Sequence, residues 1–291
     1  MTLAEFVAEQ SARLELAGVC FGQGTTNAYD EAAWLVLHAL GIAPDLFEDV
    51  TERRLTPRER VAAAALVDRR IATRQPAAYL THEAWLQGVA FHVDARTIVP
   101  RSFIAELIAD ADGSGALAAW MSSATHRVLD LCTGNGSLAV LAALAWPDVT
   151  IDASDIDASA LAVARINVDR HGLGARIALH QSDLFDAVEG RFDLIVCNPP
   201  YVNAHTMAEL PPEFRAEPAL ALAGGTDGMD LVLRIVGGAA ARLAEHGVLV
   251  LEIGNERENF ERAFPRLETV WMPVSAGDDQ VVLLTREALV R

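Results

Sequence analysis

The sequence predicts an α/β protein in which a mostly parallel, doubly wound sheet follows a small helical domain. Two observations carry this prediction. From residue 127 onward, apolar strand-like runs alternate with helical segments, and such alternation builds parallel sheets with helices on both faces. Residues 1 to about 80 carry helical signals only. With 291 residues, 52% of them hydrophobic, the chain is long enough for two domains.

Two helices of the N-terminal part have clear boundaries. Residues 29–40 place apolar side chains at helical spacing, and Gly41 ends the pattern. Thr56 is suited to the N-cap position and Pro57 to the first helical position, so a second helix is expected from there to about Thr73. We interpret this part of the chain as a small helical bundle.

The helical pattern breaks after residue 84. Gly88 and residues 94–96 separate two short apolar runs, which is consistent with a hairpin. We therefore expect a hairpin that links two domains. The expected parts are a helical domain at 1–84, a β-hairpin linker at 85–100 and a sheet domain at 101–291.

The sheet domain is predicted element by element from its apolar runs and the turn residues between them. Strands are expected at residues 127–131, 149–154, 176–180, 192–197, 247–253 and 281–284. Helices are expected at residues 104–111, 137–145, 158–171 and 231–244, with a glycine-rich break at 113–115.

Composition excludes several classes of function. The net charge of −17 argues against tight binding to bulk nucleic acid but permits attraction to a basic protein. No apolar run reaches the 18 residues of a membrane span, and the N-terminus lacks the basic and apolar regions of a secretory signal. The three cysteines fit neither a disulfide framework nor a metal site. We expect a cytoplasmic protein without a metal.

The most informative motif is Asn198-Pro199-Pro200-Tyr201, which follows the expected strand at 192–197. Two consecutive prolines cannot continue a strand, so the chain turns off the sheet there. Ligands of open α/β sheets bind at the carboxyl ends of the strands. An asparagine, two prolines and an aromatic ring at that edge are suited to a planar hydrogen-bonding group, either a glutamine amide or the exocyclic amine of a base. An ordinary strand-ending turn is the competing interpretation.

A candidate cofactor site follows the first strand of the sheet domain. Gly134 and Gly136 allow a sharp turn and a close approach of the backbone to a ligand. Asp130 precedes them, where it disfavours a pyrophosphate and attracts an ammonium group. We assign these residues and Thr133 to the cofactor site.

Acidic residues also follow the next two strands. Asp155 is suited to accept hydrogen bonds from both ribose hydroxyls, and we place Ile156 beside it in the site. Asp183 is suited to an adenine amino group, and Leu184 or Phe185 to the face of the ring. A ligand with an ammonium, a ribose and an adenine but no phosphate fits this set, so S-adenosylmethionine fits better than NAD. Each acid taken singly is also explained as a loop or capping residue.

With these residues in view, the chain resembles the N5-glutamine protein methyltransferases of the HemK, PrmC and PrmB family, which are class I Rossmann-like S-adenosylmethionine-dependent enzymes. The resemblance covers nearly the whole chain and is nearer to the PrmB members than to the release-factor enzymes. It rests on residues 78–85, 99–102, 105–108, 198–201, 217–218, 225–228 and 252–255. Departures from the usual pattern stand at Phe103, Asn135 and Ser137.

The resemblance implies methyl transfer from S-adenosylmethionine to the side-chain nitrogen of a glutamine in the third protein of the large ribosomal subunit, a basic partner. The implied catalytic residues are Asn198, Pro199 and Tyr201, and Asn198 also borders the cofactor. The implied substrate-binding residues are Arg101, Pro200, Tyr201 and Glu217. The helical domain is implied as the part that recognises the protein, either free or within a ribosomal precursor.

Three alternatives remain open from the sequence. The first is the same reaction on peptide chain release factors. The second is adenine methylation in DNA, which needs a basic groove and a base-flipping pocket that the acidic composition disfavours. The third is a ribosome-assembly factor that binds cofactor or protein without turnover.

Overall fold

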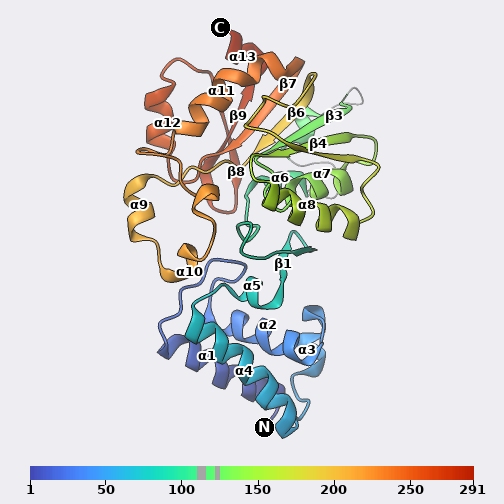
Figure 1. Ribbon diagram of the computed structural model, residues 1–291, viewed down its shortest axis with the longest axis vertical. Helices are drawn as coiled ribbons and strands as arrows, with labels where there is room; N and C mark the ends of the chain where they lie inside the picture. Colours follow the sequence, from blue (N-terminus) through green and yellow to red (C-terminus); the bar gives the residue numbers. More distant parts are fainter. Residues whose placement is uncertain (110–115, 122–124) are drawn as a thin grey trace.

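The computed structural model describes residues 1–109, 116–121 and 125–291. Figure 1 shows the N-terminal helices at one end of an elongated molecule and the large sheet at the other, with the two termini at opposite ends. The α/β fold expected from the sequence is confirmed. The division at residues 84 and 100 stays a prediction.

The N-terminal helices surround a core of their own. Helices α1, α2 and α4 pack together through buried leucine, valine and alanine side chains. The N-caps of α1 and α4 are capping boxes formed by Thr2 with Glu5 and by Thr56 with Glu59, which satisfy orphan backbone N–H groups. Both predicted helices are confirmed. The bounds are α1 Leu3–Leu16, α2 Ala28–Leu40, α3 Phe47–Val50, α4 Pro57–Thr73 and α5 Ala77–Thr81, with the 3-10 turn η1 at Pro44–Leu46.

A two-stranded hairpin connects this part to the large sheet. Strand β1, Glu83–Leu86, pairs antiparallel with β2, Val89–His92. Gln87 and Gly88 both have positive φ, as a two-residue hairpin turn requires. The hairpin therefore begins two residues before the predicted linker and ends well before residue 100, because the two-residue turn at 87–88 fixes its register.

The large sheet has seven strands in the order β5-β4-β3-β6-β7-β9-β8. The first five are parallel, and β9 and β8 are antiparallel additions at one edge. The chain order reverses between β3 and β6, which is the switch point at which such sheets bind ligands. The bounds are β3 Arg127–Leu131, β4 Thr150–Asp155, β5 Ile177–Gln181, β6 Phe192–Cys197, β7 Leu243–Glu252, β8 Val270–Val274 and β9 Gly277–Thr285.

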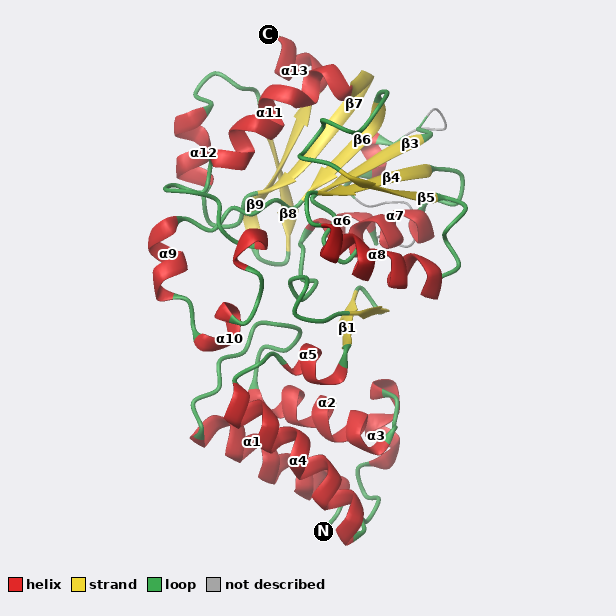
Figure 2. Ribbon diagram, in the orientation of Figure 1, coloured by secondary structure: helices red, strands yellow, loops and turns green. Residues whose placement is uncertain are grey.

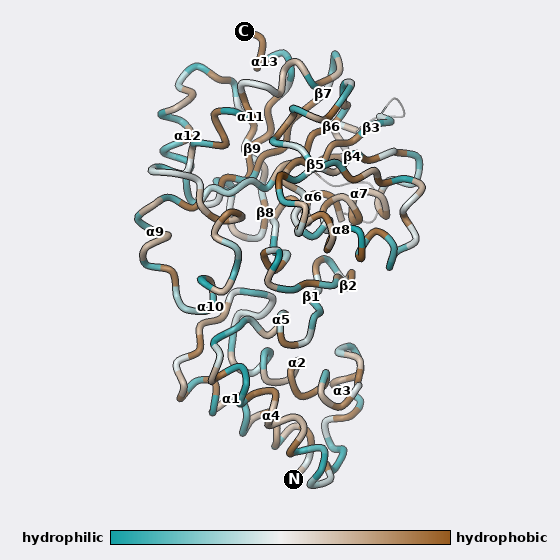
Figure 3. Tube along the Cα trace, in the orientation of Figure 1, coloured by the Kyte–Doolittle hydropathy of each residue, from teal (hydrophilic) through white to brown (hydrophobic). Residues whose placement is uncertain are grey.

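Helices cover both faces of the sheet (Figures 1 and 2). Alternate residues of each central strand contribute to two separate cores: Val128 and Val196 pack with α6, α7 and α8, whereas Leu129 and Ile195 pack with α11 and α12. The strands are accordingly among the most hydrophobic segments in Figure 3. The bounds are α6 Ile104–Ile108, α7 Ser137–Ala145, α8 Ala158–Arg170, α9 Ala204–Glu209, α10 Pro212–Arg215, α11 Asp230–Arg242, α12 Arg257–Ala263 and α13 Arg286–Val290, with 3-10 turns η2 Ala118–Trp120 and η3 Ala219–Ala221.

Several details differ from the sequence-based expectation. Strand β7 begins at Leu243 rather than at residue 247, and β8 was not expected. Helix α6 ends at Ile108, and the part of the expected helix at 110–111, like the expected break at 113–115, lies outside the described residues. None of the helices in the described ranges is long and apolar enough to cross a membrane.

Candidate active site

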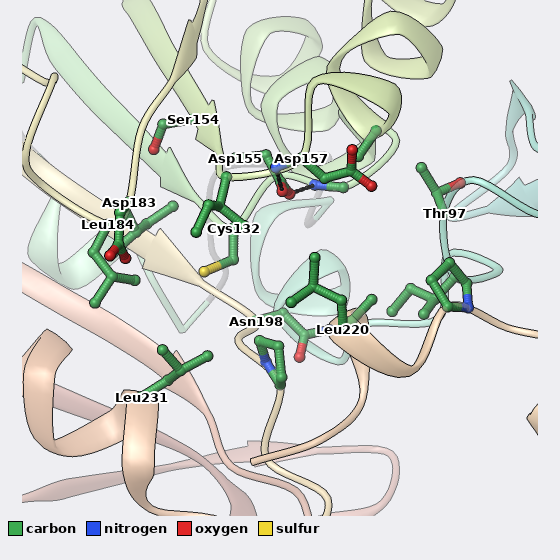
Figure 4. A pocket seen from close by; sticks show the side chains of 18 of the residues that line it. Thr97, Cys132, Ser154, Asp155, Asp157, Asp183, Leu184, Asn198, Leu220 and Leu231 are labelled. Atoms are coloured by element: carbon green, nitrogen blue, oxygen red, sulfur yellow. Dashed lines mark hydrogen bonds between the residues drawn. The ribbon is translucent and has the colours of Figure 1, made fainter. Parts of the chain in front are cut away.

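A cavity lies at the carboxyl ends of β3, β4, β5 and β6, at the switch point of the sheet. In Figure 4, Asp155 and Asp157 lie across the cavity from Asn198, and Asp183 lies at one end. We call it the cofactor cavity. Its main lining residues are Thr97, Leu131, Cys132, Gly134, Ser154, Asp155, Ile156, Asp157, Ser182, Asp183, Leu184, Asn198, Pro200, Leu220, Leu231 and Arg234.

Asp130 lies beneath the glycine turn and is fully buried. Its Oδ2 accepts hydrogen bonds from the Thr133 hydroxyl and from the Ala139 N–H at 3.0 Å. Burial raises the pKa of Asp130 to about 7. Asp130, Thr133 and Gly136 are not among the residues that line the cavity. Asp130 therefore fixes the turn and the first turn of α7 from below.

Asp155, the last residue of β4, holds the other side of the same turn. Its Oδ2 accepts from the Gly134 N–H and its Oδ1 from the Asp157 N–H, both at 2.9 Å. Each carboxylate oxygen has a second lone pair, so Asp155 retains acceptor capacity toward the cavity that it lines. Burial raises the pKa of its carboxyl above the ordinary value.

Asp183 lies at the rim of the cofactor cavity. Its Oδ2 accepts from Arg234 Nη2 at 2.9 Å, and both side chains are exposed. Leu184 follows with a positive φ of 50° and is buried against the cavity. The Asp183 carboxylate, predicted for the adenine amino group, and the Leu184 side chain, predicted for the face of the ring, therefore lie side by side (Figure 4).

The Asn198-Pro199-Pro200-Tyr201 turn separates the cofactor cavity from a second cavity. Asn198 lines both, and Pro199 and Tyr201 line only the second. No hydrogen bond of the Asn198 side chain is found within the described residues, and the residue is partly exposed. Its amide group is therefore free to bind a ligand that reaches it from either side.

The second cavity lies between the helical part and the sheet part of the chain, and we call it the entry cavity. Its walls come from the loop at residues 22–26, the hairpin, Arg101, the segment that follows Tyr201, and the end of β7. The main lining residues are Gly22, Gly24, Thr25, Trp85, Arg101, Pro199, Tyr201, Thr206, Leu210, Phe214, Glu252 and Gly254.

The Tyr201 side chain is fixed within the entry cavity. Its hydroxyl donates to Glu252 Oε1 at 3.1 Å, and Glu252 Oε2 accepts from the Ser102 hydroxyl at 2.6 Å. Burial raises the pKa of both Tyr201 and Glu252. A Cβ added to Gly254 would lie 2.4 Å from the Tyr201 ring. The ring therefore fits only because residue 254 has no side chain.

The segment at residues 222–228 holds the backbone of the same turn. The Val202 N–H donates to the Leu222 carbonyl at 2.8 Å, and the Gly224 N–H donates to the Val202 carbonyl at 2.9 Å. A Cβ on Gly228 would lie 2.3 Å from the Tyr201 carbonyl oxygen. The glycines at 225–228, recognised in the sequence without a role, belong to this supporting segment.

Arg101 lines the entry cavity, whereas Glu217 lines neither cavity. Glu217 is buried, and its two oxygens accept from Arg101 Nη1 at 2.6 Å and Nη2 at 2.7 Å. Glu217 also accepts from the Val99 N–H at 2.8 Å. Glu217 therefore orients the Arg101 side chain. Pro200 faces the cofactor cavity instead of the entry cavity.

Some lining residues have no counterpart in the sequence-based set. Thr97, Leu220 and Leu231 reach the cofactor cavity from a loop before α6, from η3 and from α11. These are ordinary residues in segments without a strand-end signal, and only the fold brings them to the switch point. Ser154 and Cys132 flank predicted residues at strand ends and could have been found by position.

Comparison with known proteins gives matches along the whole chain. The model of the methyltransferase small domain family matches residues 108–225. A ribosomal protein uL3 glutamine methyltransferase of Bordetella pertussis is 51% identical over 291 residues, covering 99% of this chain and 96% of the relative. Enzymes of the same name are 50% identical in Burkholderia pseudomallei, over 97% of this chain and 94% of the relative, and 45% identical in Neisseria meningitidis serogroup B, over 99% and 94%.

Among solved structures, the catalytic domain of hMettl16 in complex with an RNA hairpin has a TM-score of 0.50 at 13% identity, over 79% of this chain and 81% of that chain. Sheet order, cavity position and these matches define a methyltransferase with the class I fold. More narrowly, the chain belongs to the family of ribosomal protein uL3 glutamine methyltransferases. The resemblance found in the sequence is confirmed.

Proposed function

We propose that this protein transfers a methyl group from S-adenosylmethionine to the side-chain amide nitrogen of a glutamine in ribosomal protein uL3, in the cytoplasm. The observation that carries the proposal is the place of Asn198, whose free side chain borders both cavities. A group donor bound in the first cavity and an amide entering through the second would meet at this residue. The names of the relatives support the substrate.

The residues of the cofactor cavity fit S-adenosylmethionine. Asp155, Asp157 and Asp183 outnumber the arginines that line it, Arg96 and Arg234, which suits a ligand with a sulfonium and an ammonium. The Ser154 hydroxyl is buried without a hydrogen-bond partner within the described residues and lines the cavity.

We propose a residue for each part of the ligand. Asp155 would accept from the ribose hydroxyls, Asp183 and Leu184 would hold the adenine, and the turn at Gly134 would approach the ligand closely. Asp130 and Thr133 would act by holding that turn from below. When bound, the sulfonium ligand supplies an electrophilic methyl group.

The turn at residues 198–201 addresses the weak nucleophilicity of an amide nitrogen, whose lone pair is delocalised into the carbonyl. The Asn198 side-chain oxygen would accept one N–H of the glutamine, and the Pro199 carbonyl would accept the other. Positive charge that develops on this nitrogen strengthens both hydrogen bonds in the transition state. Tyr201 would stack on the flat amide, and Glu252 fixes its ring by accepting from its hydroxyl.

A matched pair of variants tests the assignment of the two cavities. We expect Asn198→Ala to bind S-adenosylmethionine with normal affinity but to lose about 10²- to 10³-fold in kcat, because one transition-state contact is gone. We expect Asp155→Ala to weaken S-adenosylmethionine affinity in calorimetry. A folded Asn198→Ala protein with near-normal turnover would contradict the mechanism, and unchanged affinity in Asp155→Ala would remove that residue from the site.

Mass spectrometry of ribosomal proteins from a deletion strain tests the substrate. Loss of one methyl group from a glutamine of uL3 is the expected result. Loss of a methyl group from release factors instead would support the alternative substrate, and an assembly defect with all methyl groups present would support the binding factor.

A further inference from the structure

Two of the walls of the entry cavity come from segments that are far apart in the chain. One wall is the loop at residues 20–27, which joins α1 to α2 and contributes Gly22, Gly24, Thr25 and Thr26. The other is the segment of α9 and α10, which contributes Thr206, Leu210 and Phe214. The two segments meet at α10, where a Cβ on Gly22 would lie 3.3 Å from the Phe214 ring.

Glu213 joins these two walls. Its side chain is fully buried, at 0% exposure. Its Oε1 accepts from the Cys20 N–H at 3.1 Å and forms ion pairs with Arg74 Nε at 2.9 Å and with Arg70 Nη1 at 3.5 Å. The Glu213 backbone carbonyl accepts from the Gln23 side chain at 3.3 Å. A single residue of α10 therefore contacts the loop and helix α4 at once.

Arg70 is itself fixed by further partners. Arg70, only 1% exposed, donates through Nε to Glu31 Oε1 at 2.8 Å and through Nη2 to the Cys20 carbonyl at 2.9 Å. Glu31 accepts in turn from the Thr25 hydroxyl at 3.1 Å, and Thr25 lines the entry cavity. We call Glu31, Arg70, Arg74 and Glu213 the buried clamp.

The chemistry of the clamp favours a positioning role over a stabilising one. Two carboxylates and two guanidinium groups balance in charge, but buried ion pairs contribute little more to stability than apolar residues of the same size. Each pair uses one carboxylate oxygen, and removing one partner would leave a buried charge uncompensated, so the pairs instead fix how the segments lie against one another. The same pairs also set the place of Phe214, which follows Glu213 in the chain. Phe214 contacts Gly22 on one side, and the Arg101 guanidinium lies 5.4 Å from its ring centroid.

We propose that Glu213 is a positioning residue for the protein substrate. By fixing the loop at residues 20–27 against α10, it sets the width of the entry cavity through which the glutamine of the substrate reaches Asn198. The proposal rests on the proposed function, and it adds a group that contacts neither cavity. None of the clamp residues lines the cofactor cavity.

Glu213→Gln tests the proposal, because glutamine keeps the size and the acceptor for the Cys20 N–H but removes the charge. We expect the KM for purified uL3 to rise about tenfold or more, as expected when a distant change misplaces a substrate. The affinity for S-adenosylmethionine and kcat at saturating uL3 should stay within about threefold of wild type, because Asn198 and Pro199 are held by other segments. The matched control is Asp68→Asn, which breaks an exposed ion pair between Asp68 of α4 and Arg13 of α1.

Arg74 provides a second test if the Glu213 variant does not fold, since its side chain is 27% exposed and tolerates change. Arg74→Met should raise the KM for uL3. Arg74→Lys should have a KM close to that of wild type, because lysine keeps the charge toward Glu213. An unchanged KM in both Glu213→Gln and Arg74→Met would overturn the proposal. If cofactor affinity and kcat fell by as much as the KM rose, the clamp would have only a structural role. That result would also overturn the proposal.

Hydrogen–deuterium exchange provides a readout without substrate. In Glu213→Gln, amides of residues 20–27 should exchange about tenfold faster, whereas those of α1 should not change. Unchanged exchange in the loop would contradict the clamp. Methylation of uL3 by the wild-type protein tests the proposed function. Hydrogen exchange in Glu213→Gln tests the clamp, and its result does not depend on whether uL3 is the substrate.

Discussion

At the scale of single residues, the turn at residues 198–201 depends both on the side chains that contact it and on nearby glycines that leave room for it. Tyr201 donates to Glu252, and its ring and carbonyl occupy space that side chains at Gly254 and Gly228 would fill. Both glycines have positive φ, so any other residue there would be strained as well as crowded. The position of the ring is therefore determined by residues more than 25 positions further along the chain.

We predict that Gly254→Ala lowers kcat/KM for uL3 by about tenfold or more. The added methyl group would lie 2.4 Å from the Tyr201 ring and would force it away from Glu252 and into the entry cavity. The affinity for S-adenosylmethionine should not change, because Tyr201 does not line the cofactor cavity. Steady-state kinetics and calorimetry measure the two quantities.

Gly237→Ala is the control for this change. Gly237 lies within α11, and a Cβ there meets nothing within 4 Å. Alanine in a helix is favoured over glycine by about 0.5–1 kcal/mol, so this variant should be at least as stable as wild type and fully active. Equal kcat/KM in Gly254→Ala and Gly237→Ala would show that activity does not depend on the position of the Tyr201 ring.

At the scale of elements, α7 is held at both ends by side chains from other segments. Asp130 accepts from the Ala139 N–H near its beginning. At its end, Arg176 donates to the carbonyls of Ala143 at 2.7 Å, Trp146 at 2.6 Å and Val149 at 3.0 Å. These carbonyls lie at and beyond the last turn, where helix carbonyls lack partners and where a positive charge is favoured by the helix dipole.

Arg176→Met should therefore reduce the free energy of unfolding by about 2 kcal/mol, because charged hydrogen bonds to three carbonyls are lost. Urea denaturation followed by circular dichroism measures this change. Arg165→Met is the comparison: Arg165 is exposed on α8, and within the described residues it has no hydrogen bond or ion pair. If both variants have the same midpoint, the contacts of Arg176 add nothing to stability.

The elements predicted well from the sequence are those whose bounds follow from their local pattern of apolar and terminating residues. Strand β3, strand β6 and helix α7 have the expected bounds, because each is an apolar run between residues that end it. Strand β8 was missed because Pro273 lies within it, and proline usually excludes a strand. The structure tolerates Pro273 because β8 is at the sheet edge and its register shifts between Met272 and Val274.

The site was predictable to the extent that it lies at strand ends. Asp155, Asp183 and Asn198 lie at or just beyond the carboxyl ends of parallel strands, so the topology brings them together. The wall of the entry cavity at the loop of residues 20–27 and α10 was not predictable, because these segments meet through tertiary contacts of Glu213 and Phe214. Nothing in the local sequence of a four-residue helix indicates such a partner.

At the scale of the whole molecule, charge is the dominant property. The chain has 40 acidic and 23 basic residues, which gives the net charge of −17. A basic ribosomal protein is attracted to such a surface over several ångströms, and salt weakens that attraction. Within the protein the same excess of carboxyl groups has a cost, because some of them are buried. Burial raises the pKa of Glu31, Asp130, Asp155 and Glu252.

The direction of the resulting pH dependence follows from linkage. The pKa of Asp130 is about 7 in the folded protein and near the ordinary aspartate value of 3.8 in the unfolded chain. Between these values the folded state holds a proton that the unfolded state has released. The contribution of Asp130 to stability is therefore fully present below about pH 4 and is lost as the pH rises through 7.

Asp130→Asn isolates this effect, because asparagine keeps an oxygen that accepts from Thr133 and from the Ala139 N–H but does not titrate. We predict that wild type loses stability relative to this variant as the pH rises from 5 to 8, with a slope of at most about 1.4 kcal/mol per pH unit for one proton. Urea denaturation of both proteins at each pH measures the difference, in which the titration of all other groups cancels. Parallel curves would mean that Asp130 is ionised throughout, and a gap that grows in favour of wild type would reverse the sign argued from its burial.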